Sequence, residues 1–221
     1  MPSLQLYSDS SPNGFKITIA LEELGLPYAL HHVRIDHGEQ RRPEFLRLNP
    51  HGRIPVLVDR AAGITLFESA AILQYLAETS GRLLPDAPRE RWEALTWLTF
   101  HASSMGPILG QRVHFEISAE ERYPPAIERY RRLSEEVFAT LDQRLAGRPW
   151  LAGRPWLAGR PWLAGEQYSI ADIATFGWTH TARIVDFDFS HYRHLDDWHR
   201  RMALRPAVQR GILLPEPAVG P

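Results

Sequence analysis

The sequence contains no cysteine among its 221 residues. Disulfide bonds, thiolate metal sites and cysteine nucleophiles are therefore excluded, and we expect no metal cofactor. Long hydrophobic runs are missing as well, since no apolar stretch approaches the roughly 18 residues of a membrane-spanning helix. A secretory signal would have a basic segment followed by an apolar segment, and the first residues of this sequence show no such pattern. These absences predict a cytoplasmic protein.

A charge excess of either sign is equally absent. The formal net charge is -1, with 25 basic and 26 acidic side chains. This balance gives no electrostatic case for a nucleic-acid or membrane partner. Lysine is almost lacking: Lys16 is the only lysine, and all the other residues in the total of lysine and arginine are arginines. The composition is 44% hydrophobic, which is enough to build one large core or two smaller ones.

The first eighty residues alternate short apolar runs with helical patterns. Strands are expected at residues 4–7, 28–35, 54–59 and 64–68. Helices are expected at residues 13–25, 42–50 and 69–81. The order βαβ, short helix, ββα predicts a mixed sheet with helices packed on it.

The remainder of the chain shows no strand pattern. Apolar residues recur every three or four positions, which predicts helices near residues 89–110, 123–145, 170–184, 195–204 and 207–214. Residues 83–88 are proline-containing and suit a linker. The predicted fold class is therefore α/β plus all-α, with an α/β domain at residues 1–82 and an all-helical domain at residues 89–214.

Residues 147–164 repeat the hexapeptide Gly-Arg-Pro-Trp-Leu-Ala three times in succession. Glycine and proline in every unit prevent a continuous helix, and three short units cannot bury a core as a solenoid does. We predict a surface loop with surplus copies, in which Trp162 or Trp150 is docked and the middle copy is more exposed. The alternative is a functional loop that binds a partner through tryptophan and arginine.

Three loops carry residues suited to a small ligand. Glu68 and Ser69 lie at the start of a helix, where an anionic group is favoured; Glu68 could hold an amine, and Ser69 either binds a carboxylate or is a simple cap. Ile54 precedes Pro55, and an open strand edge there could pair with an extended peptide. The alternative is a plain loop-to-strand junction, and Pro55 is a candidate for a cis bond. Ser11 lies between the first strand and the first helix, and could bind a ligand or only cap that helix.

Three motifs together resemble the glutathione transferase superfamily: "HGRIPVL", "LFESAAILQYLAE" and "YSIADIA". Ser169 and Asp172 of the last motif have the spacing of a capping box, which indicates a role in folding. Within the superfamily, "SPNGFKITIALEE", "GEQRRPEFLRLNP", "GPILGQRVHF" and "AIERY" are similar to the nu class. That class comprises bacterial disulfide-bond reductases related to the yeast prion-forming nitrogen regulator. Its usual Thr-Pro-Asn-Gly begins with Ser11 here, which keeps a hydroxyl.

The resemblance implies a thioredoxin-like domain followed by a helical domain, with glutathione as cosubstrate. It implies that Ser11 and Asn13 act at the glutathione sulfur as catalytic residues, although Tyr7 is an alternative thiol partner. The other implied contacts are Gln40 at the glycyl end, Ile54 at the cysteinyl backbone, Glu68 and Ser69 at the γ-glutamyl end, and Arg129 from the helical domain near a second glutathione.

The function implied is reduction of small disulfides by bound glutathione, with weak transferase or peroxidase activity, in a homodimer. The absence of cysteine fits this chemistry, because both sulfurs can come from glutathione. Two alternatives stay open. One is a non-catalytic glutathione-binding regulator. The other is a different glutathione transferase activity, such as dehalogenation, isomerisation or conjugation.

Overall fold

The computed structural model describes residues 2–146 and 161–215. Its contacts divide the chain into two compact units, one formed by Met1–Arg82 with Leu204–Pro221 and the other by Leu83–Ala203. None of the helices in the described ranges is long and apolar enough to span a membrane.

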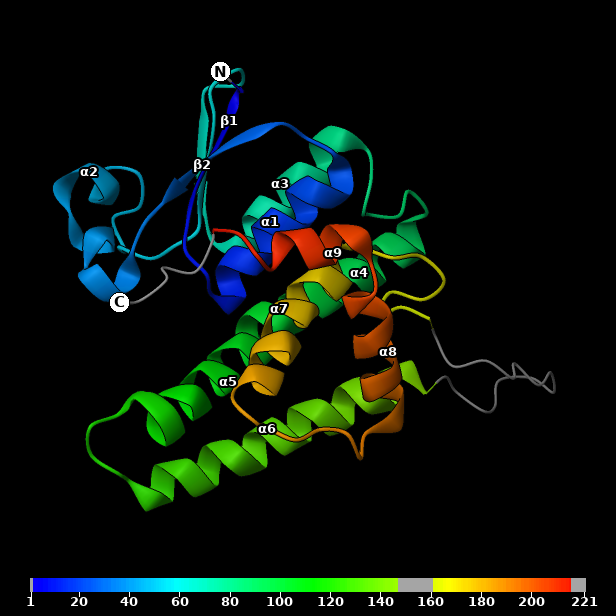
Figure 1. Cartoon of the computed structure of the whole chain (residues 1–221). Coiled ribbons are helices and arrows are strands. Elements are labelled where there is room, and N and C mark those ends of the chain that lie inside the picture. Colours follow the sequence, from blue (N-terminus) through cyan, green and yellow to red (C-terminus); the bar gives the residue numbers. More distant parts are fainter. Residues whose placement is uncertain (1, 147–160, 216–221) are drawn as a thin grey trace. The chain divides into compact units, whose positions relative to one another are not determined.

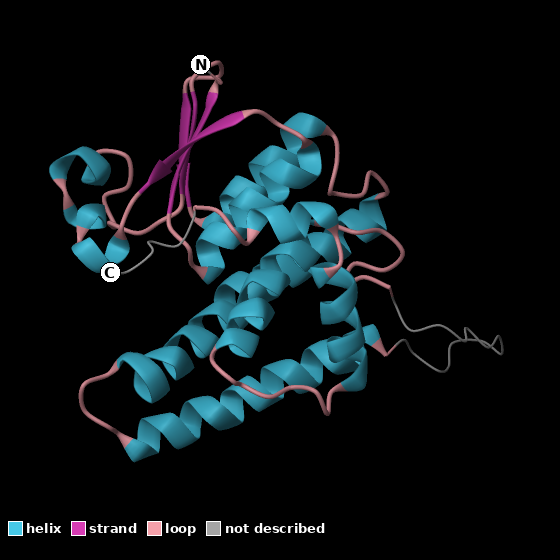
Figure 2. Ribbon diagram, in the orientation of Figure 1, coloured by secondary structure: helices cyan, strands magenta, loops and turns pink. Residues whose placement is uncertain are grey.

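The first unit contains a four-stranded mixed sheet in the order β2-β1-β3-β4 (Figure 2). β1 is parallel to β2 and antiparallel to β3, and β3 and β4 form a hairpin. The strand bounds are Leu4–Ser8, Tyr28–His32, Val56–Asp59 and Ile64–Phe67. The mixed sheet expected from the sequence is confirmed. However, β2 ends before the expected residue 35 and β3 begins after the expected residue 54.

Helices pack on both faces of this sheet (Figure 1). α1 (Pro12–Leu24) contacts α3 (Ser69–Ser80), and α3 contacts β3 and β4. On the other face, α2 (Pro43–Leu46) contributes Phe45 to a buried cluster with Val33 and Val56. The alternation of side chains along a strand explains the two faces: Val56 belongs to this cluster, whereas the next residue, Leu57, is fully buried outside it.

The last helix, α9 (Pro206–Gly211), packs against α1 (Figure 1). Thr18 Oγ1 donates to the carbonyl oxygen of Gly211 at 2.6 Å, and Arg205 forms two hydrogen bonds with Glu23 at 2.6 and 3.0 Å. A Cβ atom on Gly211 would lie 2.7 Å from the backbone of Ile19, so only glycine allows this approach. The expected helical domain, residues 89–214, therefore differs from the second compact unit, which ends at residue 203.

The described residues of the second unit form helices joined by loops, with no strand among them. Its α-helices are α4 (Pro88–Phe100), α5 (Gly106–Val113), α6 (Pro124–Leu145), α7 (Ile170–Ile184) and α8 (Arg193–Ala203). Two π-helical stretches, His101–Met105 and His114–Ser118, continue α4 and α5. The single helix expected at residues 89–110 is thus a helical run that extends to residue 118 and contains two wider turns.

The start of α7 is organised around the buried side chain of Asp172. Its Oδ2 accepts the backbone N–H of Ser169 at 3.0 Å, which completes the expected capping box. Its Oδ1 accepts hydrogen bonds from Leu163 N and Trp198 Nε1, both at 2.9 Å. Burial raises the pKa of the Asp172 carboxyl to about 6, and these hydrogen bonds oppose the shift.

The end of the hexapeptide repeat is anchored at the same place. Leu163 is fully buried, its N–H is bound by Asp172, and its carbonyl oxygen accepts from Arg144 Nε at 2.7 Å. The neighbouring Trp162 packs edge-on against Tyr168, with ring centroids 5.0 Å apart. Trp162 is therefore docked, as expected; Trp150 and the middle copy lie outside the described residues.

Candidate functional site

The loop between β1 and α1 carries the first site residues. Ser11 has extended backbone angles, and its Oγ accepts the N–H of Gly14 at 3.0 Å, so it caps α1. The hydroxyl hydrogen of Ser11 has no acceptor among the described residues, and the cap leaves it free to donate to a ligand. A Cβ atom on Gly14 would lie 2.1 Å from the carbonyl oxygen of Asp9. Glycine at this position therefore allows the first turn of α1 to pack closely against the backbone of Asp9.

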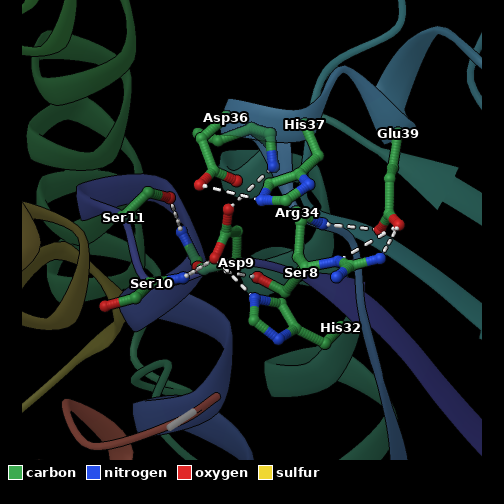
Figure 3. A network of polar contacts seen from close by, with 11 residues as sticks. Ser8, Asp9, Ser10, Ser11, His32, Arg34, Asp36, His37 and Glu39 are labelled. Carbon is green, nitrogen blue, oxygen red and sulfur yellow. Dashed lines mark hydrogen bonds and ion pairs between the residues drawn. The ribbon is translucent and has the colours of Figure 1, made fainter. Parts of the chain in front are cut away.

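Asp9 ties this loop to the segment that follows β2 (Figure 3). Its Oδ1 accepts from Ser10 N at 2.7 Å and lies 2.8 Å from His32 Nε2. Its Oδ2 accepts from Ile35 N at 2.9 Å. One carboxylate thus fixes the conformation of two loops that are far apart in the sequence.

Gln40 lies in the segment that Asp9 holds. Its Nε2 donates to the carbonyl oxygen of Ile35 at 3.1 Å, whereas its buried Oε1 accepts from no described residue. The adjacent Glu39 accepts from the backbone N–H and the guanidinium of Arg34 (Figure 3). The hydrogen bond from the Arg34 side chain lowers the pKa of Glu39 to about 2. Gln40 therefore carries a buried acceptor without a described partner, in a segment held by Asp9 and by the Arg34–Glu39 pair.

The start of α3 carries Glu68 and Ser69. Glu68 has φ +69°, a region that residues other than glycine rarely occupy, and its side chain is exposed. Such strain persists where the surroundings impose it, often at ligand sites. Ser69 is the first helical residue and does not cap α3, because Glu68 occupies the N-cap position. The capping interpretation of Ser69 is therefore wrong, and its Oγ instead accepts from Lys16 Nζ at 3.2 Å.

Lys16 connects the two helix starts. Its side chain is only 2% exposed, and its Nζ donates to Asn13 Oδ1 at 2.7 Å as well as to Ser69. Burial lowers the pKa of Lys16 to about 7, and the negative charge of Glu68 opposes the shift. The structure therefore brings Asn13, Ser69 and Glu68 together around one amine.

Lys16 is not among the site residues expected from the sequence. Its position three residues after Asn13 places both on one side of α1, and this spacing was a usable signal. The contact with Ser69 joins positions 53 residues apart, so local pattern could not reveal it.

Ile54 lies just before β3, and the Ile54–Pro55 bond is cis. The strand it leads into is flanked by β1 and β4, so Ile54 is not part of an open strand edge as one interpretation held. Within the described residues, its backbone N–H and carbonyl form no hydrogen bond, so both are available to an extended ligand. Its side chain packs on the Phe45 cluster together with Tyr7, whose ring stacks on His31 at 4.4 Å.

Arg129 belongs to the other unit. It lies on α6 with an exposed side chain and forms no ion pair with a described residue. Its contact with a second glutathione stays a prediction. The described ranges contain no group of three or more His, Cys, Asp and Glu side chains that could hold a metal ion.

Comparisons with known proteins agree with this architecture. Residues 10–79 match the family profile described as "Glutathione S-transferase, N-terminal domain", and residues 113–206 match "Glutathione S-transferase, C-terminal domain". The chain is 40% identical over 215 residues to the disulfide-bond oxidoreductase YfcG of Escherichia coli, covering 95% of this chain and 94% of that protein. It is 35% identical to YghU, a disulfide-bond oxidoreductase of the same organism, covering 96% and 74% of the two chains.

Solved structures lead to the same family. A glutathione transferase from Pseudomonas putida, with one glutathione disulfide bound per subunit, is 38% identical with a TM-score of 0.83, covering 97% of this chain and 92% of that one. One from Burkholderia graminis, with two glutathione molecules bound per subunit, is 38% identical with a TM-score of 0.86, covering 97% and 89%. The chain therefore belongs to the glutathione transferase family, among its nu-class-like members.

Proposed function

We propose that this protein reduces small disulfides with glutathione, which it holds at Ser11, Asn13, Gln40, Ile54, Glu68 and Ser69. The observation that carries the proposal is the arrangement around Lys16, in a chain without cysteine. Three side-chain donors, on Ser11, Asn13 and Ser69, have no acceptor among the described residues. Such donors suit a ligand with a thiolate and a carboxylate.

The chemistry needs no sulfur from the protein. The thiolate of one glutathione attacks a disulfide RSSR, which forms a mixed disulfide and releases one RS⁻. A second glutathione thiolate attacks the glutathione sulfur of the mixed disulfide, forms glutathione disulfide and releases the second RS⁻; each RS⁻ takes up one proton. The disulfide gains the two electrons that the two glutathiones lose. The role of the protein is to favour the thiolate form, which is the nucleophile. We assign this role to Ser11 and Asn13.

Two measurements test the proposal. Calorimetry should detect binding of glutathione or its disulfide at millimolar concentration. Reduction of bis(2-hydroxyethyl) disulfide, followed as glutathione disulfide forms, should depend on the protein. Absence of binding would overturn the assigned ligand. Binding without turnover would instead favour a regulatory protein, and turnover only with haloalkane or epoxide substrates would favour another transferase activity.

Replacing Ser69 with alanine should weaken glutathione binding. A hydroxyl that donates to a charged carboxylate contributes about 1–3 kcal/mol, which corresponds to a rise in Kd of about fivefold to a hundredfold. Ser80→Ala is a matched control, since Ser80 ends the same helix and its Oγ donates to the carbonyl of Ala77. Calorimetry should show a weaker complex for the first variant only. Equal affinities would remove Ser69 from the site.

Deleting residues 153–164, which are two whole hexapeptides, should leave activity almost unchanged. The remaining copy has the same sequence as the third, so it can supply the buried leucine that Asp172 and Arg144 hold. Shortening a loop from three such units to one changes its closure entropy by only about 1 kcal/mol. We expect glutathione affinity and reductase rate within about twofold of the full chain, or about 0.4 kcal/mol. A large loss of activity with the circular dichroism spectrum unchanged would show that the repeat is functional.

The proposal includes a homodimer that acts in the cytoplasm. The dimer is inferred from the family resemblance, and the cytoplasmic location from the absence of cysteine. Light scattering on the purified chain measures the assembly, and a monomer would contradict this part of the proposal.

A further inference from the structure

We propose that Lys16 is a positioning residue. By donating hydrogen bonds to Asn13 Oδ1 and Ser69 Oγ, it turns the donors of these two side chains toward the sulfur and the γ-glutamyl carboxylate of glutathione. The inference rests on the proposed function, because it assumes that glutathione occupies this site. It adds to that function a residue that touches neither the sulfur nor the carboxylate but determines which atoms of Asn13 and Ser69 face them.

The hydrogen-bonding capacity of the Lys16 amine determines which atoms can face it. As an ammonium, the form that the negative charge of Glu68 favours, Lys16 has three donors and no acceptor. Each group that it contacts in this form presents a lone pair. At 2.7 Å from Lys16 Nζ, the amide of Asn13 must place Oδ1 toward the amine. Its Nδ2 then points the other way, and the two N–H donors on it have no acceptor among the described residues.

The same reasoning applies to Ser69. Its Oγ accepts from Lys16 at 3.2 Å, so the hydroxyl hydrogen is directed away from the amine. That hydrogen has no acceptor within the described part of the chain. Lys16 therefore converts two groups that could each donate or accept into two donors. Both ligand groups assigned to these positions, a thiolate and a carboxylate, accept hydrogen bonds.

The location of Lys16 supports a functional role. Burying a lysine is unfavourable unless its amine is hydrogen-bonded or paired with a charge, and this one is 2% exposed. Its hydrogen-bond partners lie at the starts of α1 and α3, at the residues assigned to the ligand. A methionine would fill the same volume without the cost of burying an amine. The structure therefore retains a costly group where it orients Asn13 and Ser69.

The test compares Lys16→Met with a matched control on the same helix. Thr18→Val removes a buried hydroxyl that donates to Gly211, a residue outside the glutathione site. The pKa of the thiol of bound glutathione is measured from thiolate ultraviolet absorbance, together with kcat, KM for glutathione and thermal stability. For Lys16→Met we expect the bound thiol pKa to rise by about one unit and KM to rise about tenfold, with an intact fold. Thr18→Val should lower stability and leave the thiol pKa and KM unchanged.

A double variant separates positioning from direct electrostatics. If Lys16 acts through Asn13, then adding Lys16→Met to Asn13→Ala should not change the thiol pKa further. If the amine acts directly on the sulfur, its removal should raise the thiol pKa in both backgrounds, and that result would overturn the proposal. An unchanged thiol pKa and KM in Lys16→Met alone would also overturn it.

Failure of the proposed function gives a different result. If the wild-type protein binds glutathione but reduces no disulfide, the function is wrong, and the thiol pKa and binding affinity of Lys16→Met still decide the role of Lys16. If the wild-type protein reduces disulfides and Lys16→Met does so equally with an unchanged thiol pKa, the function stands and the role of Lys16 is wrong. If the wild-type protein binds no glutathione, both are overturned.

Discussion

Replacing Asp172 with alanine is expected to lower the free energy of unfolding by about 3 kcal/mol. The carboxylate accepts from the backbone N–H groups of Ser169 and Leu163 and from the indole of Trp198. Alanine would leave these donors buried and unpaired, each at a cost of about 1–3 kcal/mol, while removing a carboxylate that is itself costly to bury. Denaturation in urea measures the loss, and glutathione binding by the folded variant should be unchanged.

Two further variants sharpen this test. Asp188→Ala is the control, because Asp188 is exposed and accepts hydrogen bonds from the backbone and side chain of the nearby Ser190. Its loss should stay under about 1 kcal/mol. Asp172→Asn keeps an oxygen for Leu163 and Trp198 but turns an amide toward the N–H of Ser169, so its effect should be intermediate. Equal stability of Asp172→Ala and the wild type would show that the capping box contributes nothing.

The Asp172→Asn variant also tests how the stability of the folded protein depends on pH. The pKa of Asp172 is about 6 in the folded protein against 3.8 ordinarily, so the folded state favours the protonated acid. A group whose folded pKa is raised contributes stability below its unfolded pKa and loses that contribution as pH rises through the folded value. The wild type should therefore lose stability relative to Asp172→Asn as pH rises from about 4 to about 6. An advantage of the wild type that increases over this range would contradict the raised pKa.

The sequence predicted the order and type of the elements well, because amphipathic periodicity is a local property. Ser11 and Gly25 mark the two ends of α1 through capping chemistry, and the Ser169–Asp172 spacing predicted the start of α7. Each of these signals lies within a few residues of the element it bounds. The predicted boundaries were wrong where pairing with a neighbouring strand sets the end of an element. β3 is an example, because it begins only where Val56 pairs with β1 and β4.

The parts that could not be predicted depend on contacts between distant positions. The packing of α9 on α1 joins Thr18 to Gly211, which are 193 residues apart, so the helix was assigned with the helices that precede it in the chain. One of the two interpretations of Ser69 rested on the capping preference of serine, whereas its partner in the structure is a lysine on another helix. The sequence therefore supports a proposal for the set of site residues, but the amine that contacts two of them, Asn13 and Ser69, was visible only in the fold.

Replacing Asn13 with alanine is expected to lower the rate of disulfide reduction by about tenfold to a hundredfold. A hydrogen bond to a charged group contributes about 1.5–3 kcal/mol, and each 1.36 kcal/mol of barrier is a factor of ten in rate. Asn13→Asp is the discriminating variant, because it keeps an oxygen for Lys16 Nζ and replaces the amide donor with a second negatively charged oxygen. It should therefore be at least as slow as Asn13→Ala. An Asn13→Asp variant with full activity would show that Asn13 serves only to hold Lys16.

Ser11 requires a different set of variants, since its Oγ also caps α1. Ser11→Thr keeps both the cap and the hydroxyl and should retain the rate. Ser11→Gly loses the hydroxyl but only a few tenths of a kcal/mol of capping stability, so a fall in its rate reports catalysis rather than folding. We expect about a tenfold fall in the reduction rate, with the thiol pKa of bound glutathione raised. Tyr7, stacked on His31, is tested alongside as Tyr7→Phe. If Tyr7→Phe lost activity while Ser11→Gly and Asn13→Ala kept it, the thiolate partner would be the tyrosine and the assignment to Ser11 and Asn13 would be wrong.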